Sequence, residues 1–331
     1  MNLRSNAGSW AAVLALALMA GLAAMAIGGR AKPAAHDAVP RGEILARLPD
    51  GRALDFHCLG HGAPTVILEA GFGAGAEAWG AVQPLIAPVT RVCAYSRAGY
   101  GLSDPGPMPR DGEAIARDLD FGLRAARIGG PYVLVGHSAG GLYARLFAAR
   151  RRRDVAGLVF VDTSVEHQTR RLEALFGANA GSLDGVRRRP ARCLEATLEP
   201  RAPASEAALL DCAPASLGGR ARRAALRPET WRTQVSELDT LFAVTSDEVD
   251  RTGRLLQDVP AIVLTAAKAD GVRATVDDPG ALAWQHFHQV LAASFRHGDQ
   301  RLVRSSHLML IDRPQVVADA AIELVRRARS P

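Results

Sequence analysis

Short apolar runs alternate along the chain with longer stretches in which apolar residues recur at intervals of three and four. Continuous or alternating apolar runs of about four to eight residues are typical of strands, and intervals of three and four are typical of helices. The segments predicted to be strands are 44–48, 53–59, 65–69, 91–95, 131–135, 157–161, 260–265 and 301–304. The segments predicted to be helical are 76–87, 111–128, 141–150, 279–294 and 314–329.

This alternation predicts an α/β fold, a mostly parallel sheet with helices on both faces. The first two strands are joined by Pro49-Asp50-Gly51-Arg52, whose Asp-Gly centre favours a tight hairpin turn. The pattern stops between Thr163 and Asp258, where helical patches and Pro and Gly breaks replace the strands. We therefore expect one α/β domain over residues 44–331, interrupted by an insertion at 163–258.

The N-terminus carries a segment of a different kind. Trp10 to Ile27 is an uncharged apolar run of 18 residues, preceded by Arg4 as the only charged side chain. As a helix it would be roughly 27 Å long, enough to span a hydrocarbon core, and Ala24-Met25-Ala26 resembles a signal-peptide cleavage site. Residues 1–43 are therefore expected to be a leader plus linker that directs export. A cleaved signal and a retained transmembrane tether through residues 10–27 are both open, so the protein is expected in the periplasm, outside the cell or anchored in the membrane.

Composition narrows the class of protein. The chain has 331 residues, of which 48% are hydrophobic and 22% charged, which excludes a disordered or low-complexity protein. The net charge of +6 is modest and the arginines are scattered, so no nucleic-acid partner is expected. Four cysteines are too few for a disulfide-built scaffold. In an oxidising compartment Cys58 could pair with Cys93 and Cys193 with Cys212; four buried thiols are the alternative.

A candidate nucleophile lies in Gly136-His137-Ser138-Ala139-Gly140, directly between a predicted strand and a predicted helix. A G-x-S-x-G sequence at a sharp strand-to-helix turn holds the serine oxygen above the sheet, at the positive end of the helix. The predicted context of the motif is met here, and Ser138 is the expected nucleophile.

A serine hydroxyl needs a base, and the base needs a group that orients it. His307, in a loop after the last predicted strand, is the expected base. The acid is expected to be Asp270, five residues after Thr265 closes a strand, because that loop gives its carboxylate reach. Asp162, which directly follows the strand 157–161, is the alternative acid. Both choices give the chain order Ser, Asp, His.

The oxyanion of such a reaction needs backbone N–H donors. Ala139 at the start of the helix would supply one, and Phe72 in the loop Glu69-Ala70-Gly71-Phe72-Gly73 the second. No histidine, cysteine or carboxylate cluster in the sequence has the spacing of zinc ligands, so no metal and no cofactor is expected.

Taken together, these segments resemble the α/β-hydrolase fold superfamily from about residue 44 to 329, apart from the middle block. GHSAG looks like the nucleophile elbow of that superfamily, and VILEAGFG like its oxyanion loop, with Glu69-Ala70 where many members carry His-Gly. The segment from Tyr95 to Asp104 resembles its D-R-x-G-x-G-x-S motif, with Ser96 in place of Asp, and SSHLMLIDRPQVV resembles the ending that carries the histidine. The resemblance implies an eight-stranded sheet with a helical lid after the sixth strand, and it again points to Asp270.

A serine nucleophile is unlike haloalkane dehalogenases and most epoxide hydrolases, which use aspartate. The resemblance therefore implies hydrolysis of a small-molecule acyl ester through an acyl-enzyme. Two alternatives are open: an acyltransferase with the same triad, and a non-catalytic ligand-binding protein on this scaffold. The substrate itself is not indicated, because the lid that shapes the pocket has the least readable sequence.

Overall fold

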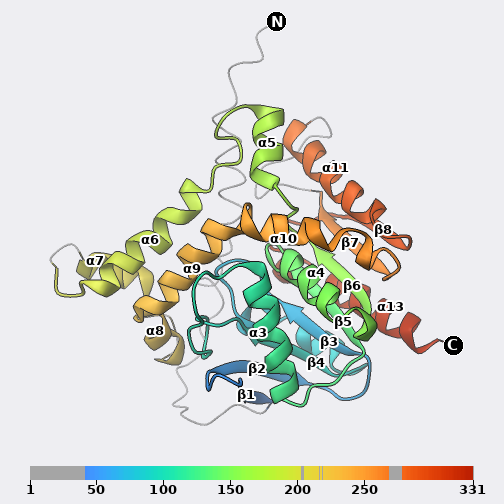
Figure 1. Cartoon of the computed structure of the whole chain (residues 1–331), viewed down its shortest axis with the longest axis horizontal. Coiled ribbons are helices and arrows are strands. Elements are labelled where there is room, and N and C mark those ends of the chain that lie inside the picture. Colours follow the sequence, from blue (N-terminus) through green and yellow to red (C-terminus); the bar gives the residue numbers. More distant parts are fainter. Residues whose placement is uncertain (1–41, 203–204, 216, 218, 268–277, 331) are drawn as a thin grey trace, which may run out of the picture.

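The computed structural model describes residues 42–202, 205–215, 217, 219–267 and 278–330. Eight strands form one sheet in the order β1-β2-β4-β3-β5-β6-β7-β8 (Figure 1). Their bounds are β1 Glu43–Arg47, β2 Ala53–Leu59, β3 Thr65–Glu69, β4 Val92–Ser96, β5 Tyr132–His137, β6 Val155–Val161, β7 Ala261–Ala266 and β8 Gly298–Val303. Strand β2 runs antiparallel to β1 and β4, and every other neighbouring pair is parallel. The predicted mostly parallel sheet is confirmed.

Helices cover both faces of this sheet (Figure 1). The helices of the body are η1 Ala76–Trp79, α2 Gln83–Ile86, α3 Gly112–Ala125, α4 Gly140–Arg150, η2 Arg152–Asp154, α11 Pro279–Ala293, α12 Met309–Asp312 and α13 Pro314–Arg329. Helices α3 and α4 pack together on one face, and α2 and α13 pack on the other.

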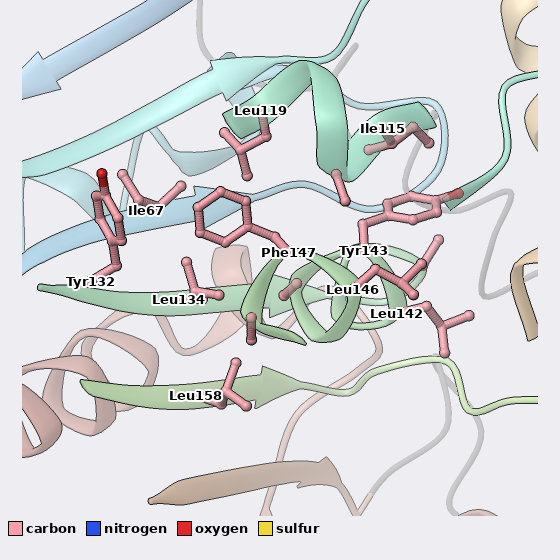
Figure 2. Packing of buried hydrophobic residues seen from close by; sticks show 14 of the residues in the cluster. Ile67, Ile115, Leu119, Tyr132, Leu134, Leu142, Tyr143, Leu146, Phe147 and Leu158 are labelled. Carbon is pink, nitrogen blue, oxygen red and sulfur yellow. The ribbon is translucent and has the colours of Figure 1, made fainter. Parts of the chain in front are cut away.

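The apolar strands explain why both faces are covered. Side chains alternate across a strand, so Ile67, Leu134 and Leu158 join the core beneath α3 and α4 (Figure 2). Their neighbours Val66 and Val133 belong to a second core, which α13 covers. The central strands are therefore apolar at every position, and they are recognisable from the sequence for that reason.

Two elements differ from their predictions. The predicted helix 76–87 is two short helices, η1 and α2. Helix α2 begins at Gln83, and Pro84 is its second residue. Proline has no N–H to donate to a preceding turn, so a helix starts there more readily than it continues. Strand β8 begins at Gly298, three residues before the predicted 301, because it lies at the sheet edge and its half-exposed side chains give no apolar pattern.

Between β6 and β7 the chain forms only helices within its described residues: α5 Gln168–Phe176, α6 Asp184–Leu198, α7 Ser205–Cys212, α8 Gly219–Ala225, α9 Pro228–Leu241, α10 Val244–Thr252 and η3 Gly253–Leu256. In Figure 1 α6, α7 and α8 extend to one side of the body, while α10 lies against α4. We call residues 163–258 the lid.

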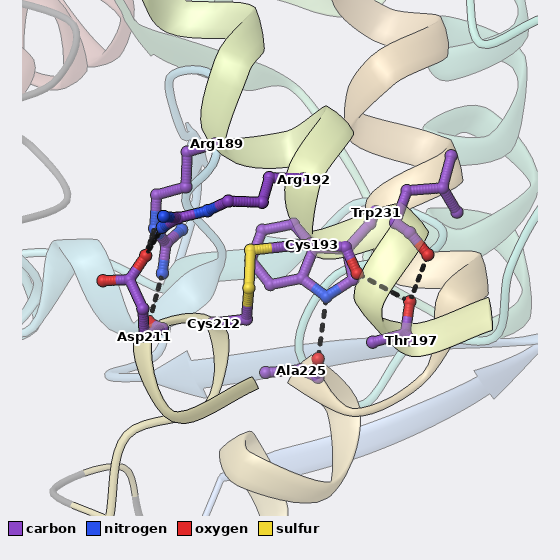
Figure 3. The surroundings of a disulfide bond; sticks show 9 residues. Arg189, Arg192, Cys193, Thr197, Asp211, Cys212, Ala225 and Trp231 are labelled. Atoms are coloured by element: carbon purple, nitrogen blue, oxygen red, sulfur yellow. Dashed lines mark hydrogen bonds and ion pairs between the residues drawn. A yellow bond between two sulfur atoms is a disulfide. The ribbon is translucent and has the colours of Figure 1, made fainter. Parts of the chain in front are cut away.

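Both cysteine pairs that the sequence left open are disulfides. Cys58 and Cys93 face each other on the neighbouring strands β2 and β4. Cys193 and Cys212 join α6 to α7, and the Trp231 ring of α9 packs against them (Figure 3). The Trp231 N–H donates to the carbonyl of Ala225 at 2.8 Å. One disulfide thus joins two strands of the sheet, and the other ties the outer helices of the lid together.

The apolar segment 10–27 lies outside the described residues. Among the helices that the structure does describe, none combines the length and the apolar character needed to cross a membrane.

Candidate active site

The serine of the G-x-S-x-G motif lies at the turn between β5 and α4. Its backbone φ is +51°, a left-handed conformation that residues other than glycine rarely adopt. The Ser138 N–H donates to the carbonyl of Val161 at 3.2 Å, which ties the turn to the neighbouring strand. Its Oγ is buried and has no hydrogen-bond partner in the described part of the chain. A strained turn of this kind persists only where the surrounding structure holds it.

Glycines allow this turn to pack tightly against the loop after β3. A Cβ on Gly140 would lie 2.4 Å from the carbonyl oxygen of Glu69 and 2.6 Å from that of Ala70. A Cβ on Gly71 would lie 3.1 Å from the Ser138 Cβ. The loop that contains Phe72 therefore lies against the turn that holds Ser138.

The structure pairs His307 with Asp162. The Nδ1–H of His307 donates to Oδ2 of Asp162 at 2.7 Å. The other carboxylate oxygen, Oδ1, accepts hydrogen bonds from the Ala266 N–H at 2.9 Å and from the Trp284 indole N–H at 2.8 Å. The carboxylate is thus held from two sides, and it fixes both the orientation and the tautomer of the imidazole.

Electrostatics keep the Asp162 carboxylate ionised. Burial by itself would raise its pKa, but the hydrogen bond and the charge of His307, together with the Trp284 N–H, hold it at about 2. An ionised acid is the form that can stabilise a positively charged imidazolium beside it.

A second histidine supports the loop of the first. The Nε2–H of His137 donates to the backbone carbonyl of His307 at 3.0 Å, and the two rings lie 4.8 Å apart. Burial and the neighbouring His307 lower the pKa of His137 to about 3. His137 is therefore neutral near pH 7. Because it directly precedes Ser138, its hydrogen bond ties the loop of His307 to the turn that holds the serine.

The favoured acid of the sequence analysis, Asp270, lies outside the described residues. The alternative, Asp162, occupies the Nδ1 side of His307. The longer loop of Asp270 was the reason to prefer it, but the carboxylate at the end of β6 is already within hydrogen-bond distance of the imidazole. The Asp162 backbone φ of +41° turns the chain directly after β6, and this turn directs the side chain toward His307.

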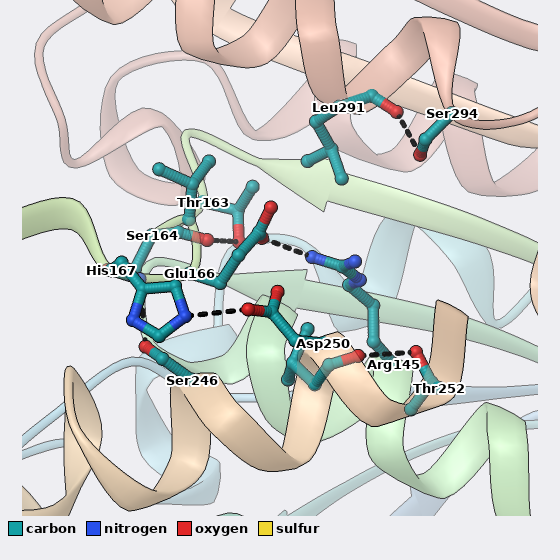
Figure 4. Close-up of polar contacts among 12 residues, drawn as sticks. Arg145, Thr163, Ser164, Glu166, His167, Ser246, Asp250, Thr252, Leu291 and Ser294 are labelled. Carbon is teal, nitrogen blue, oxygen red and sulfur yellow. Dashed lines mark hydrogen bonds and ion pairs between the residues drawn. The ribbon is translucent and has the colours of Figure 1, made fainter. Parts of the chain in front are cut away.

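Glu166 and His167, which follow Asp162 at the start of the lid, make polar contacts to the body and to other helices of the lid (Figure 4). Glu166 accepts hydrogen bonds from Arg145 of α4 at 2.7 Å and from Arg171 of α5 at 3.0 Å. Nε2 of His167 lies 2.6 Å from Oδ2 of Asp250 in α10. These contacts fix the position of the segment that directly follows Asp162.

The sequence analysis missed the residues that support this site. Trp284 contacts the acid, and Arg97 binds the loop of Phe72: Nη1 donates to the Ala70 carbonyl at 2.6 Å and Nη2 to that of Gly71 at 2.9 Å. Arg97 stands in the segment that resembled the D-R-x-G-x-G-x-S motif, and no sequence signal marks Trp284. Among the described residues, no group of three metal-ligating side chains lies close enough to hold an ion.

Known proteins share this arrangement of elements. A family model for the alpha/beta hydrolase fold matches residues 64–236, just over half of the chain. The putative carbamate hydrolase RutD of Klebsiella pneumoniae (strain 342) is 35% identical over 103 residues, which are 30% of this chain and 38% of that protein. The curated relatives are matched over only 12% to 43% of their own lengths.

Two solved structures have the same fold. A thermophilic esterase from Thermogutta terrifontis aligns with a TM-score of 0.59 at 19% identity, over 87% of this chain and 99% of that chain. A loop variant of the haloalkane dehalogenase DbeA from Bradyrhizobium elkanii aligns with a TM-score of 0.61 at 17% identity, over 86% of this chain and 96% of that chain. The sheet order, the serine turn and the match to the family model lead to one assignment: the chain belongs to the alpha/beta hydrolase fold family.

Proposed function

We propose that the protein is a serine hydrolase that cleaves small acyl esters through Ser138, His307 and Asp162. The observation that carries this proposal is the hydrogen bond between His307 Nδ1 and Asp162 Oδ2 at 2.7 Å, in a loop that His137, the residue before the strained turn of Ser138, holds by a hydrogen bond to the His307 carbonyl. A nucleophile, a base and an ionised acid in this chain order are the groups that acyl transfer requires.

The reaction proceeds in two halves. Ser138 Oγ attacks the acyl carbon while His307 Nε2 takes its proton, and the carbonyl electron pair moves onto oxygen. The Phe72 and Ala139 N–H groups stabilise that oxyanion. When the intermediate collapses, the C–O bond to the alcohol breaks and His307 returns the proton to the leaving oxygen. Water then attacks the acyl-enzyme in the same way and releases the acid.

The relatives support the class of reaction. The esterase structure shares the fold, and the Klebsiella relative is described as a putative carbamate hydrolase. Esters and carbamates both carry an acyl carbonyl that a serine can attack. A serine at position 138 argues for this chemistry and against dehalogenation, which the resemblance associates with aspartate at that position.

The test compares the full chain with Ser138→Ala on a short p-nitrophenyl ester. We expect turnover to fall by at least about 10³-fold in the variant, and a fluorophosphonate to add one adduct to the unmodified chain, on Ser138. Undiminished turnover in Ser138→Ala would contradict the proposal. A folded wild-type protein that neither turns over the ester nor reacts with the probe would favour a non-catalytic binding protein. Transfer of the acyl group to an added alcohol in preference to water would favour an acyltransferase.

We further propose that the protein acts outside the cytoplasm, either free or tethered through residues 10–27. The disulfides Cys58–Cys93 and Cys193–Cys212 support this location, because such bonds persist in oxidising compartments. Fractionation of cells that express the full chain, with N-terminal sequencing of the product, tests it. A reduced protein in the cytosolic fraction would contradict this location.

A further inference from the structure

Arg97 makes two hydrogen bonds to the oxyanion loop, the loop after β3 that contains Phe72. It directly follows β4, is 2% exposed, and contacts two successive carbonyl groups of the loop. Its Nη1 donates to the carbonyl of Ala70 at 2.6 Å, and its Nη2 donates to the carbonyl of Gly71 at 2.9 Å. A guanidinium is planar and presents its donors in a rigid fork, so two bonded carbonyls are held in a fixed relation to each other.

The direction of one carbonyl determines the direction of the next N–H. The carbonyl of Gly71 and the N–H of Phe72 belong to the same peptide unit, which is planar and, in its trans form, points the two groups in opposite directions. Fixing Gly71 O on Arg97 therefore fixes where the Phe72 N–H points. A cation on the carbonyl side also polarises the peptide unit and makes its N–H a stronger donor.

The positive charge of Arg97 is balanced on both sides. Glu69 Oε1 accepts from Nη1 at 2.9 Å, and Glu237 Oε1 accepts from Nη2 at 2.9 Å. Burial alone would lower the pKa of Arg97, but these two carboxylates raise it well above the usual value, so the guanidinium stays charged. Tyr100 donates to Oε2 of Glu237 at 2.8 Å and Tyr143 donates to Oε1 at 3.0 Å, so both oxygens of this carboxylate are hydrogen-bonded.

Glu237 lies on α9, so the support of the oxyanion loop includes the lid. Its side chain is 1% exposed and reaches Arg97 across 140 positions of sequence. Movement of α9 away from the body would separate two buried charges, which is strongly destabilising. The α9 part of the lid is therefore fixed to the site.

We propose that Arg97 is a positioning residue of the oxyanion hole, which aims the Phe72 N–H at the developing oxyanion and is itself held in place by Glu237 of the lid. This role rests on the proposed serine hydrolase activity. It predicts that changes at Arg97 weaken binding of the transition state and leave binding of the ground state almost intact.

The test is Arg97→Lys, which keeps the buried charge but replaces the fork by a single ammonium. We expect kcat for the p-nitrophenyl ester to fall about 10- to 100-fold, less than or equal to the loss of a whole oxyanion donor, while KM stays within about threefold. The inhibition constant of a trifluoromethyl ketone, which forms a tetrahedral adduct with the serine, should rise by a factor similar to the fall in kcat/KM.

Arg110→Lys is the matched control, because Arg110 is as deeply buried as Arg97 but pairs with Asp118 instead of the oxyanion loop. It should lower the unfolding midpoint and leave kcat within about threefold. If Arg97→Lys does not fold, Glu237→Gln replaces it, since glutamine keeps an acceptor for Nη2 but removes the charge; a fall in kcat of about fivefold or more is then expected at unchanged KM.

A folded Arg97→Lys with kcat within threefold of the wild type, or with only KM changed, would overturn the role of Arg97 and leave the hydrolase proposal intact. The same holds for an unchanged kcat in Glu237→Gln. Failure of the wild-type chain to turn over the ester or to label at Ser138 would instead overturn the proposed function, and with it this role.

Discussion

His307 Nδ1 and Asp162 Oδ2 lie 2.7 Å apart although 145 positions of sequence separate them. Asp162 directly follows β6, and His307 lies in the loop after β8, two strands further along the sheet. The backbone of the intervening strand contributes to the contact, because the Ala266 N–H at the end of β7 binds the same carboxylate. The carboxyl ends of three neighbouring parallel strands therefore build this pair together.

Asp162→Asn should lower kcat for the p-nitrophenyl ester by about 10³- to 10⁴-fold with little change in KM, because an amide no longer stabilises the imidazolium or its tautomer. Asp270→Asn is the matched control and should leave kcat within about threefold. Steady-state kinetics of the two variants checks this. A larger loss in Asp270→Asn would return the role of the acid to Asp270.

Trp284→Phe should lower kcat about three- to tenfold. The indole N–H donates to Asp162 Oδ1 at 2.8 Å, and phenylalanine retains a smaller aromatic ring but has no such donor. One hydrogen bond to a buried carboxylate contributes on the order of 1.5–3 kcal/mol, but Ala266 continues to hold the same oxygen. Kinetics combined with the unfolding midpoint separates the effects. A drop in the midpoint alone, at unchanged kcat, would show that Trp284 only packs against the site.

The contribution of His137 to stability should decrease as pH falls below about 6.5, whereas the buried carboxyl groups of Glu69 and Glu248, whose pKa values burial raises to about 7, contribute in the opposite direction. The pKa of His137 is about 3 in the folded protein, against an ordinary value of 6.5, so between these limits the unfolded chain binds a proton that the folded chain excludes. This contribution of His137 to the free energy of unfolding should fall by several kcal/mol over this range. His288, whose pKa burial also lowers, acts in the same direction. Below about pH 4, protonation of Asp162 adds to the loss.

Urea denaturation at pH 7.5 and 5.0 measures this dependence, with His137→Gln as the comparison. Glutamine retains an N–H donor for the His307 carbonyl but does not titrate. Between pH 7.5 and 5.0 the variant should lose less stability than the wild type, because the contribution of His137 is absent. Equal dependence in both proteins would mean that His137 is not the group responsible.

Removal of the lid disulfide by a Cys193→Ala/Cys212→Ala double substitution should lower the free energy of unfolding by about 3 kcal/mol, because the bond closes a loop of 19 positions in the unfolded chain. Limited proteolysis should then cut the lid near α7 and α8 before the body. Dithiothreitol should have little further effect on the lid of the double variant, in contrast to the wild type. An unchanged unfolding midpoint and cleavage pattern would contradict this structural role.

Most of the strands and helices, and the turn that holds Ser138, could be predicted from local sequence. Strands buried on both faces are apolar at every position, so β3, β5 and β6 are visible as short runs, and the strand-to-helix context identifies the turn of Ser138. The edge strand β8 starts earlier than predicted, because a half-exposed strand needs no apolar pattern.

The sequence by itself determined the fold class, the turn of Ser138, the loop of Phe72 and the place of His307 after the last strand, since each follows from residues close together in sequence. Only the tertiary structure decided that Asp162 contacts His307, that Trp284 holds the carboxylate, and that Arg97 joins the oxyanion loop to the lid. The carboxyl ends of all parallel strands meet at one edge of the sheet, so several carboxylates qualify there by chain order alone. Which of them contacts the imidazole depends on backbone turns and on donors supplied by distant segments, and these exist only once the chain is folded.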